Sequence, residues 1–405
     1  MPFANIDRVL AKDTEMKITG VETRIVNAIH RNWIFVKVLT DQPGLYGWGE
    51  ATLEWKTRAV VGAIEDLATF VIGEDPRRIE HLVRKMQMHS FWPLGVIGLS
   101  AISGIEMALY DITAKELGVP VWRLLGGQSR DWVRVYTHFR RGKIGAQVDP
   151  RDIEGYVAGV EETVAMGYKA VKLGVVPYTH FDAPIPEVKH VARLVERIRL
   201  AVGDEIDIMF DFHGRCGSIS AAVAYIDAIS PMRPLFVEEP IQPGDNEAMA
   251  LVASKVQAPL ATGERLFTPR EFFDLAVHKA VGIVQPDLCH VGGFTMGKRI
   301  AAIAEVGHMG VAPHNPLGPI SGAAALHFAV ATPNFVIQEE ARGLVDWYDD
   351  VVRHPIVLDD GRWRIPMAPG LGVELDEAAA DKHPFEQEII PAREAHAVDG
   401  TILNW

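Results

Sequence analysis

The chain has 405 residues, 48% of them hydrophobic, and its 53 acidic residues outnumber 40 Lys and Arg to leave a formal net charge of −13. The length suits a barrel of roughly 250 residues with a second domain, and the composition excludes a disordered chain. The acidic balance argues against nucleic-acid binding, and two cysteines, too few to staple such a chain, favour a reducing compartment.

The sequence shows neither a membrane span nor an export signal. No apolar run reaches the roughly 18 residues that cross a bilayer. Residues 1–15 lack the apolar core of a signal peptide. Regular patterning begins near Met16, so residues 1–15 are expected to form a loose extension. We therefore expect a cytoplasmic protein that binds neither membranes nor nucleic acids.

Residues 16–130 are expected to fold as an α+β capping domain. Two runs rich in β-branched residues, KITGVETRIV (17–26) and IFVKVLT (34–40), predict strands. The Asp-Pro pair at 75–76 suits the start of a helix that continues through IEHLVRKM. A second helix is predicted over residues 100–117, where a glycine then stops it.

Short apolar runs alternate with amphipathic helical stretches from residue 131 to about 356. The runs are VRVYTH (133–138), KAVKL (169–173), IDIMFD (206–211), PLFVEE (234–239), PLAT (259–262), VGIVQPD (281–287), MGVAPH (309–314) and FVIQEE (335–340). A helical stretch in every interval predicts parallel strands with right-handed crossovers. Eight such strands favour a closed (β/α)₈ barrel over residues 131–356. An open doubly wound sheet is the alternative, but its glycine-rich phosphate loop is absent. Residues 357–405 are expected to pack back onto the capping domain.

Ionisable residues occupy six successive strand ends of this predicted barrel. They are Asp211 and His213, Glu238 and Glu239, Glu264, Asp287, His314, and Glu339 and Glu340. Their leading members recur every 23 to 27 residues, about one βα unit. A single carboxylate at a strand end commonly caps a helix or faces solvent. Six in succession predict an active-site mouth, because catalytic residues of such barrels gather at the carboxyl ends of the strands.

Three of these carboxylates predict a metal site. Asp211, Glu238 and Glu264 come from adjacent strands, and close carboxylates repel one another unless a cation lies between them. Oxygen ligands on rigid elements suit Mg²⁺, whereas no Cys/His cluster has the spacing of a zinc site. Asp287 and His314 lie on neighbouring strands, so a carboxylate–imidazole hydrogen bond that raises the basicity of the ring is expected.

A second imidazole faces the same cleft. His213 stands two residues beyond Asp211 and therefore on the same side of an extended chain. One imidazole would remove a proton while the other protonates a leaving group. The neighbouring Cys289 and His290 are interpreted as structural residues, because adjacent side chains on extended backbone point apart.

Long motifs then resemble the mandelate racemase branch of the enolase superfamily. They are SAISGIEMALYDITAKELGVPVWRLLGG (100–127), LFVEEP (235–240), ATGERL (261–266) and GLGVELDE (370–377). Within that branch the chain resembles sugar-acid dehydratases of the galactonate dehydratase type. The motifs for this closer resemblance are DFHGR (211–215), QPD (285–287) and APHNPLGPI (312–320). The resemblance runs over essentially the whole chain from Met16 and implies a capped barrel.

The resemblance also implies residue roles. Those roles are one Mg²⁺ held by Asp211, Glu238 and Glu264, His314 as base oriented by Asp287, His213 as acid, and Glu339 facing the substrate carboxylate. The implied enzyme is a carbon–oxygen lyase. It removes the C2 proton of an aldonate and eliminates the 3-hydroxyl to give a 2-keto-3-deoxy acid.

Differences from the motifs of other enzymes in the superfamily narrow the choice of reaction. Racemases and cycloisomerases of the superfamily carry K-x-K at the second strand, whereas Lys172 is followed here by Leu173 and Gly174. Mannonate dehydratases share the third-strand histidine, but they lack the sixth-strand aspartate and use a tyrosine from a longer insertion. Here that insertion, residues 175–186, is short, although it contains Tyr178. The galactonate type is favoured. A mannonate-type or other sugar-acid dehydratase or epimerase, and a non-catalytic metabolite-binding protein, are the alternatives.

Substrate contacts are expected from strand ends and from the capping segments 28–33 and 50–58, since capping loops close over the substrate in this family. The candidate residues are Lys172, Arg215, His138, Arg31, Trp33 and Lys56. The expected partner is a small-molecule sugar acid, and the family implies a homo-oligomer.

Overall fold

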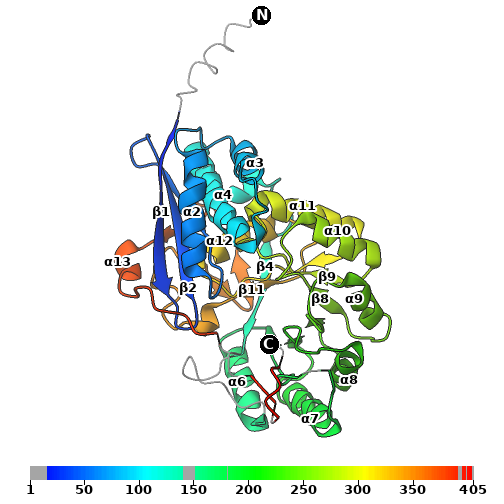
Figure 1. Ribbon diagram of the computed structural model, residues 1–405. Helices are drawn as coiled ribbons and strands as arrows, with labels where there is room; N and C mark the ends of the chain where they lie inside the picture. Colours follow the sequence, from blue (N-terminus) through cyan, green and yellow to red (C-terminus); the bar gives the residue numbers. More distant parts are fainter. Residues whose placement is uncertain (1–15, 140–150, 180, 391–394, 398, 404–405) are drawn as a thin grey trace, which may run out of the picture.

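The computed structural model describes residues 16–139, 151–179, 181–390, 395–397 and 399–403. An N-terminal α+β unit, blue in Figure 1, lies beside a ring of strands whose helices run from α6 to α12. The expected (β/α)₈ barrel with an α+β capping domain is confirmed. The expected extension over residues 1–15 lies outside the described residues.

The capping domain is an antiparallel sheet covered by helices. Its strands are β1 (Ile18–Asn27), β2 (Asn32–Thr40) and β3 (Tyr46–Glu50), in the order β1-β2-β3. Its helices are α2 (Thr57–Val71), α3 (Ile79–His89), α4 (Gly95–Leu117) and the short α5 (Val121–Leu124). Strand β3 contacts α4 closely, because a Cβ on Gly47 or Gly49 would collide with backbone carbonyls of that helix.

Helix α4 is longer than the sequence predicted. By length and mean apolar composition alone it is the one helix among the described residues that would suit a membrane span. The buried Glu106 and Asp111 interrupt the apolar run in the sequence. In the structure, 78% of the apolar window of α4 is buried inside the protein.

Eight parallel strands of the described chain close the barrel. They are β4 (Trp132–His138), β5 (Ala170–Leu173), β6 (Asp207–Asp211), β7 (Phe236–Glu238), β8 (Leu260–Thr262), β9 (Ile283–Val284), β10 (Gly310–Val311) and β11 (Gln338–Glu340). Neighbours pair in this order, and β11 pairs with β4. A bridge between Val311 and Phe335 joins β10 to the chain that enters β11, so the ring closes.

Helices fill the intervals between the strands, as predicted. They are α6 (Ile153–Ala165), α7 (Ile185–Val202), α8 (Ile219–Ile229), α9 (Asn246–Ala253), α10 (Pro269–His278), α11 (Gly293–Val306) and α12 (Pro319–Val330), with 3₁₀ turns at Ser230–Met232 and Arg342–Leu344. Side-chain caps fix several starts. Asp152, Ser218 and Asp245 each accept a backbone N–H, and Thr268 forms a capping box with Glu271.

One apolar side chain from each strand, or from the residue next to it, fills the barrel interior. These residues are Tyr136, Ala170, Met209, Phe236, Ala261, Ile283, Ala312 and Ile337. All are buried, so the barrel centre is a packed core and not a pore. The chemistry of the molecule is therefore confined to the ends of the strands.

The C-terminal segment differs in part from the expectation that it packs on the capping domain. Its elements are β12 (Val352–Arg353), β13 (Leu358–Asp359), β14 (Arg362–Arg364), β15 (Glu374–Leu375) and α13 (Glu377–Ala380). Strand β14 pairs antiparallel with Trp132–Arg134 of the barrel. The reason is that β5 reaches only Thr137 and His138, so the start of β4 has free backbone groups. Farther on, the Glu377 carboxylate lies 2.5 Å from Lys37 Nζ of the capping sheet.

Candidate active site at the barrel mouth

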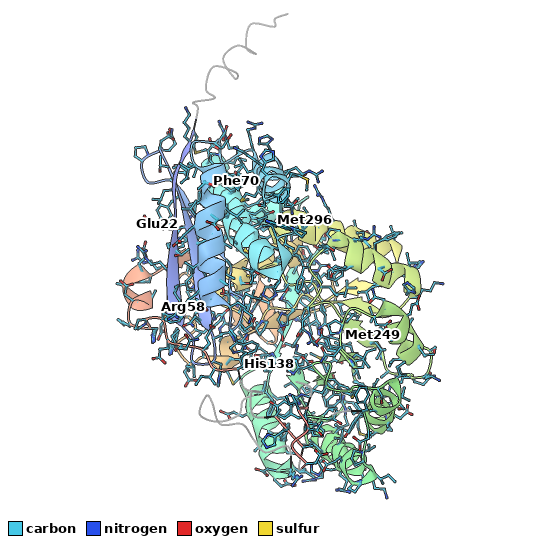
Figure 2. The ribbon with its side chains drawn as sticks, viewed as in Figure 1. Glu22, Arg58, Phe70, His138, Met249 and Met296 are labelled. Carbon is cyan, nitrogen blue, oxygen red and sulfur yellow. The ribbon has the colours of Figure 1, made fainter. Side chains whose placement is uncertain are left out.

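The period-two geometry of the strands places the candidate site directly above the interior core. Six candidate residues lie two positions after a residue of the interior ring and thus on the same side of the strand. They are His138, Lys172, Asp211, Glu238, His314 and Glu339. The end of β4, where His138 is labelled in Figure 2, lies near the middle of the molecule. The side chains of these strands therefore converge on one mouth.

The three predicted metal ligands come together. One carboxylate oxygen from each of Asp211, Glu238 and Glu264 lies within 4.8 Å of the other two. Glu238 Oε1 is buried and has no hydrogen-bond partner among the described residues. Three carboxylates that can each offer a hard oxygen donor fit a divalent cation such as Mg²⁺.

The carboxylates titrate abnormally because they are buried close together. Burial raises the pKa of Glu238 to about 7, and the charge of Asp211 acts in the same direction. Burial, with the charge of Glu239, also raises the pKa of Glu264 well above its usual value. Burial opposes ionisation of Asp211, but His213 and Lys172 outweigh it and lower its pKa. The cluster thus needs added positive charge to stay fully ionised.

Lys172 already supplies one positive charge to this cluster. Its Nζ lies 2.8 Å from Glu238 Oε2, 2.9 Å from Glu339 Oε1 and 3.1 Å from Asp211 Oδ2, and its side chain is 1% exposed. Burial disfavours the ammonium, but Glu238 and Glu339 outweigh it and raise the pKa of Lys172 well above its usual value. Lys172 was predicted to contact substrate; the structure places its ammonium among the carboxylates of Asp211, Glu238 and Glu339.

The predicted pair of Asp287 and His314 is present. His314 Nδ1 lies 2.7 Å from Asp287 Oδ2, so Nδ1 carries the donated proton and Nε2 faces the cluster. His314 Nε2 is 3.3 Å from Glu264 Oε2 and 4.0 Å from Glu339 Oε2. Burial opposes its charged form, but Glu264, Glu339 and Asp287 raise the pKa of His314 well above its usual value.

His213 lies on the opposite side of the cluster at a left-handed backbone position. Its φ is 50°, and its Nε2 lies 3.3 Å from Asp211 Oδ2. Burial lowers the pKa of His213 to about 3; Asp211 opposes this shift, and Arg215 adds to it. A non-glycine residue at positive φ is a strained conformation that is enriched at functional sites.

Glu339 links the cluster to its far rim. Its Oε1 lies 2.8 Å from His138 Nε2, and its Oε2 accepts from the Asn315 amide at 2.8 Å. Burial opposes ionisation, but Lys172, His314 and His138 lower the pKa of Glu339 well below its usual value. Glu339 is therefore a charged acceptor. The Asn315 contact could not be predicted, because it is made by a backbone amide.

The remaining predicted substrate residues occupy different surroundings. Arg31 Nη1 lies 2.5 Å from Glu54 Oε1 and donates to the Pro316 carbonyl at 2.8 Å, so it reaches the loop that follows His314. The guanidinium of Arg215 lies 4.6 Å from the Tyr178 ring centroid.

Trp33 and Lys56 are the last two predicted substrate residues. Trp33 is buried, and its ring packs against Trp347 and Tyr348. Its contacts are those of a core residue. Lys56 is exposed just before α2, and no ion pair to the cluster among the described residues involves it.

Two further contacts support the site. Glu239, beside Glu238, pairs with Arg265 through contacts of 2.5 to 3.1 Å, and only the charge at a strand end pointed to it. His290 Nε2 lies 3.1 Å from the Thr52 carbonyl of the capping domain. That contact joins residues 238 positions apart, which no local pattern reveals.

Comparison with family models decides the family. The model described as mandelate racemase / muconate lactonizing enzyme, N-terminal domain, matches residues 8–126. The model described as enolase C-terminal domain-like matches residues 155–379. The chain belongs to the mandelate racemase / muconate lactonizing enzyme family. The resemblance inferred from the motifs is confirmed.

Individual relatives agree with this family. A D-galactonate dehydratase of Xanthomonas oryzae pv. oryzae is 38% identical over 399 residues, which cover 96% of this chain and 100% of that protein. A D-galactonate dehydratase of Ralstonia nicotianae is 39% identical over 372 residues, covering 90% and 93%. These relatives confirm the expected enzyme class, a hydro-lyase.

Solved structures share the whole fold. A mandelate racemase/muconate lactonizing enzyme-like protein of Roseovarius sp. TM1035 is 35% identical with a TM-score of 0.85, covering 91% of this chain and 96% of that one. A member of the enolase superfamily from Salmonella Typhimurium is 31% identical with a TM-score of 0.85, covering 91% and 98%.

Proposed function

We propose that the chain is a Mg²⁺-dependent dehydratase of aldonic acids. It removes the C2 proton and eliminates the 3-hydroxyl as water, which gives a 2-keto-3-deoxy acid. The observation that carries the proposal is the placement of the Asp287–His314 pair and of His213 around one cluster of three carboxylates. D-Galactonate is the first substrate to test, because the curated relatives above are D-galactonate dehydratases.

Asp211, Glu238 and Glu264 would hold the ion. When bound there, Mg²⁺ supplies positive charge that stabilises the charge gained by the substrate carboxylate as its C2–H bond breaks. Lys172 lies among the same carboxylates and adds a fixed positive charge at this position. Glu339, held by the Asn315 amide and by His138, is the acceptor proposed to face the substrate carboxylate.

His314 is the proposed base. Its Nδ1–H bond to Asp287 fixes the tautomer, so the Nε2 lone pair is the one available to the C2 proton. A base must be neutral before it accepts a proton. Glu264 is the neighbour that does most to raise the pKa of His314, and it is also a candidate ligand. A cation held by Glu264 would neutralise the charge of that carboxylate. The pKa of His314 would then fall towards the range that a base needs.

His213 is the proposed acid for the departing 3-hydroxyl. Breaking the C3–O bond releases hydroxide unless a proton is supplied, and His213 lies across the carboxylate cluster from His314. This role requires a protonated ring. Burial lowers the pKa of His213 to about 3, and the Asp211 charge opposes this shift. The role of His213 is therefore tested separately from that of His314.

The test is a substrate panel. Purified protein with Mg²⁺ is incubated with C5 and C6 aldonic and aldaric acids, and 2-keto-3-deoxy products are detected with semicarbazide. Turnover of an aldonate that is lost in His314→Asn supports the proposal, and loss in His213→Asn supports the acid role. Exchange of the C2 proton for solvent deuterium without product would point to an epimerase. No reaction and no exchange with any acid would favour the alternative that the chain is a non-catalytic metabolite-binding protein.

A further inference from the structure

We propose that His290 is a positioning residue that ties the capping domain to the catalytic pair Asp287–His314. This inference rests on the proposed function, because it concerns the same base. His290 follows Asp287 by three residues, and its side chain is 5% exposed. Its two ring nitrogens face two different parts of the molecule, the capping domain and the Asp287 carboxylate.

One ring nitrogen is bound to the capping domain. Nε2 lies 3.1 Å from the Thr52 carbonyl oxygen, and because a carbonyl can only accept, Nε2 is the donor. Thr52 is itself held in place. Its Oγ1 accepts from the Ile34 amide at 3.0 Å and donates to the Glu50 carboxylate at 2.7 Å. The imidazole is therefore bonded to a rigid point of the cap.

The other ring nitrogen faces the catalytic carboxylate. Nδ1 lies 3.6 Å from Asp287 Oδ2, the same oxygen that accepts from His314 Nδ1 at 2.7 Å. At 3.6 Å this contact is too long for a hydrogen bond. Nδ1 is buried and has no hydrogen-bond partner among the described residues. The ring therefore acts on Asp287 by occupying the space beside Oδ2.

Together the contacts leave the Asp287 carboxylate little freedom. Oδ1 accepts from the Cys289 amide at 2.7 Å, Oδ2 is held by His314, and the His290 ring lies beside Oδ2. Removing the ring would let Asp287 turn and His314 follow it, although the His290 contacts described here are to Thr52 and Asp287 and not to the three carboxylates of the cluster. Misplacement of a catalytic group by about 1 Å can cost on the order of 10²-fold in rate. We therefore expect the loss of the ring to lower kcat.

The experiment compares His290→Ala and His290→Gln with Cys289→Ala. Cys289 is the matched control, because it is also buried and its Sγ also contacts the cap, at the Glu50 carbonyl 3.2 Å away. Cys289→Ala keeps the backbone amide that binds Asp287 and removes only the thiol. With the aldonate that the wild type turns over, we expect kcat of His290→Ala to fall by about 10–100-fold. KM and Mg²⁺ affinity should change little. His290→Gln should recover part of the loss, since its amide can again donate towards Thr52.

A second readout does not depend on turnover. The proton shared by Asp287 and His314 is expected to give a low-field ¹H NMR signal, assigned by its loss in Asp287→Asn. We expect this signal to shift or broaden in His290→Ala and to stay unchanged in Cys289→Ala. Equal signals in the wild type, His290→Ala and Cys289→Ala would overturn the inference even if the wild type dehydrates no acid. Equal kcat per folded enzyme in His290→Ala and Cys289→Ala would overturn it where the proposed function holds.

Discussion

Lys172 is the residue on which the charge balance of the site depends most. Three carboxylates lie within 3.1 Å of its ammonium. We predict that Lys172→Met lowers the free energy of unfolding by about 3 kcal/mol without divalent metal, because breaking a buried ion pair leaves uncompensated charge. Mg²⁺ should raise the melting temperature of this variant more than that of the wild type, since it binds the same carboxylates.

Lys169→Met is the control for that measurement, because Lys169 is half-exposed and lies 3.2 Å from an exposed Asp360. Thermal unfolding with and without Mg²⁺ gives both comparisons. A Lys172→Met protein as stable as the control, with no larger response to Mg²⁺, would contradict the placement of Lys172 among the metal ligands.

Asp287 gives a prediction for the base. Asp287→Asn should lower kcat by about 10²–10⁴-fold, because the amide no longer fixes the tautomer of His314. Mg²⁺ affinity, measured by titration calorimetry, should be unchanged, since Asp287 is not a proposed ligand. Asp274→Asn removes the carboxylate of a surface Asp–His pair, at 3.5 Å from His278, and should have no effect. A large loss of Mg²⁺ binding in Asp287→Asn would instead place this aspartate at the metal.

The residues at the strand ends could be predicted because the two-residue period of a strand is local. Asp211, Glu238 and His314 each follow an interior residue by two positions, and that spacing is visible in the sequence. The neighbours of these residues could not be predicted. Lys172 among the carboxylates and Thr52 beside His290 depend on long-range packing that no local pattern encodes.

At the scale of elements, helix α11 begins on a carboxylate from another domain. Glu106 of α4 accepts from the amides of Phe294 and Thr295 at 2.9 and 2.8 Å, and a Cβ on Gly293 would collide with it. We predict that Glu106→Ala lowers the free energy of unfolding by about 2–4 kcal/mol, because two buried amides lose their acceptor. Glu116→Ala, on the exposed face of α4, should change it little; chemical denaturation measures both. Equal stability of the two variants would contradict this role.

The elements that could be predicted from the sequence are largely the repeating strand–helix units of the barrel. The barrel strands and helices follow an alternating pattern with turn signals, so their order and approximate bounds were confirmed. Strand β3 was missed because YGWGE is short and contains glycines, and α2 because no polar residue caps its start. The β13–β14 hairpin was missed because it is defined by the free backbone edge of β4 and not by its own sequence.

At the scale of the whole molecule, buried carboxylates join the two domains. Glu50 accepts from the Gly318 and Ser321 amides, and Asp111 accepts from the Leu371 amide, in addition to the contacts of Glu106. We predict one cooperative unfolding transition by calorimetry, because neither domain can open without exposing these charges. Two resolved transitions would contradict this coupling. The homo-oligomer implied by the family remains a prediction, which light scattering can test.

The most direct test of the proposed function follows the C2 proton itself. D-Galactonate is incubated in D₂O with Mg²⁺ and either the wild-type protein or His314→Asn, and ¹H NMR follows the reaction. We predict that with the wild type the C2 proton signal of the substrate disappears and a 2-keto-3-deoxy product deuterated at C3 is formed. With His314→Asn, or in a metal-free sample, the substrate should stay unchanged. Product formation that persists in His314→Asn would contradict the assignment of the base. An unchanged C2 signal with the wild type, for galactonate and for the other aldonates, would contradict the proposed dehydration.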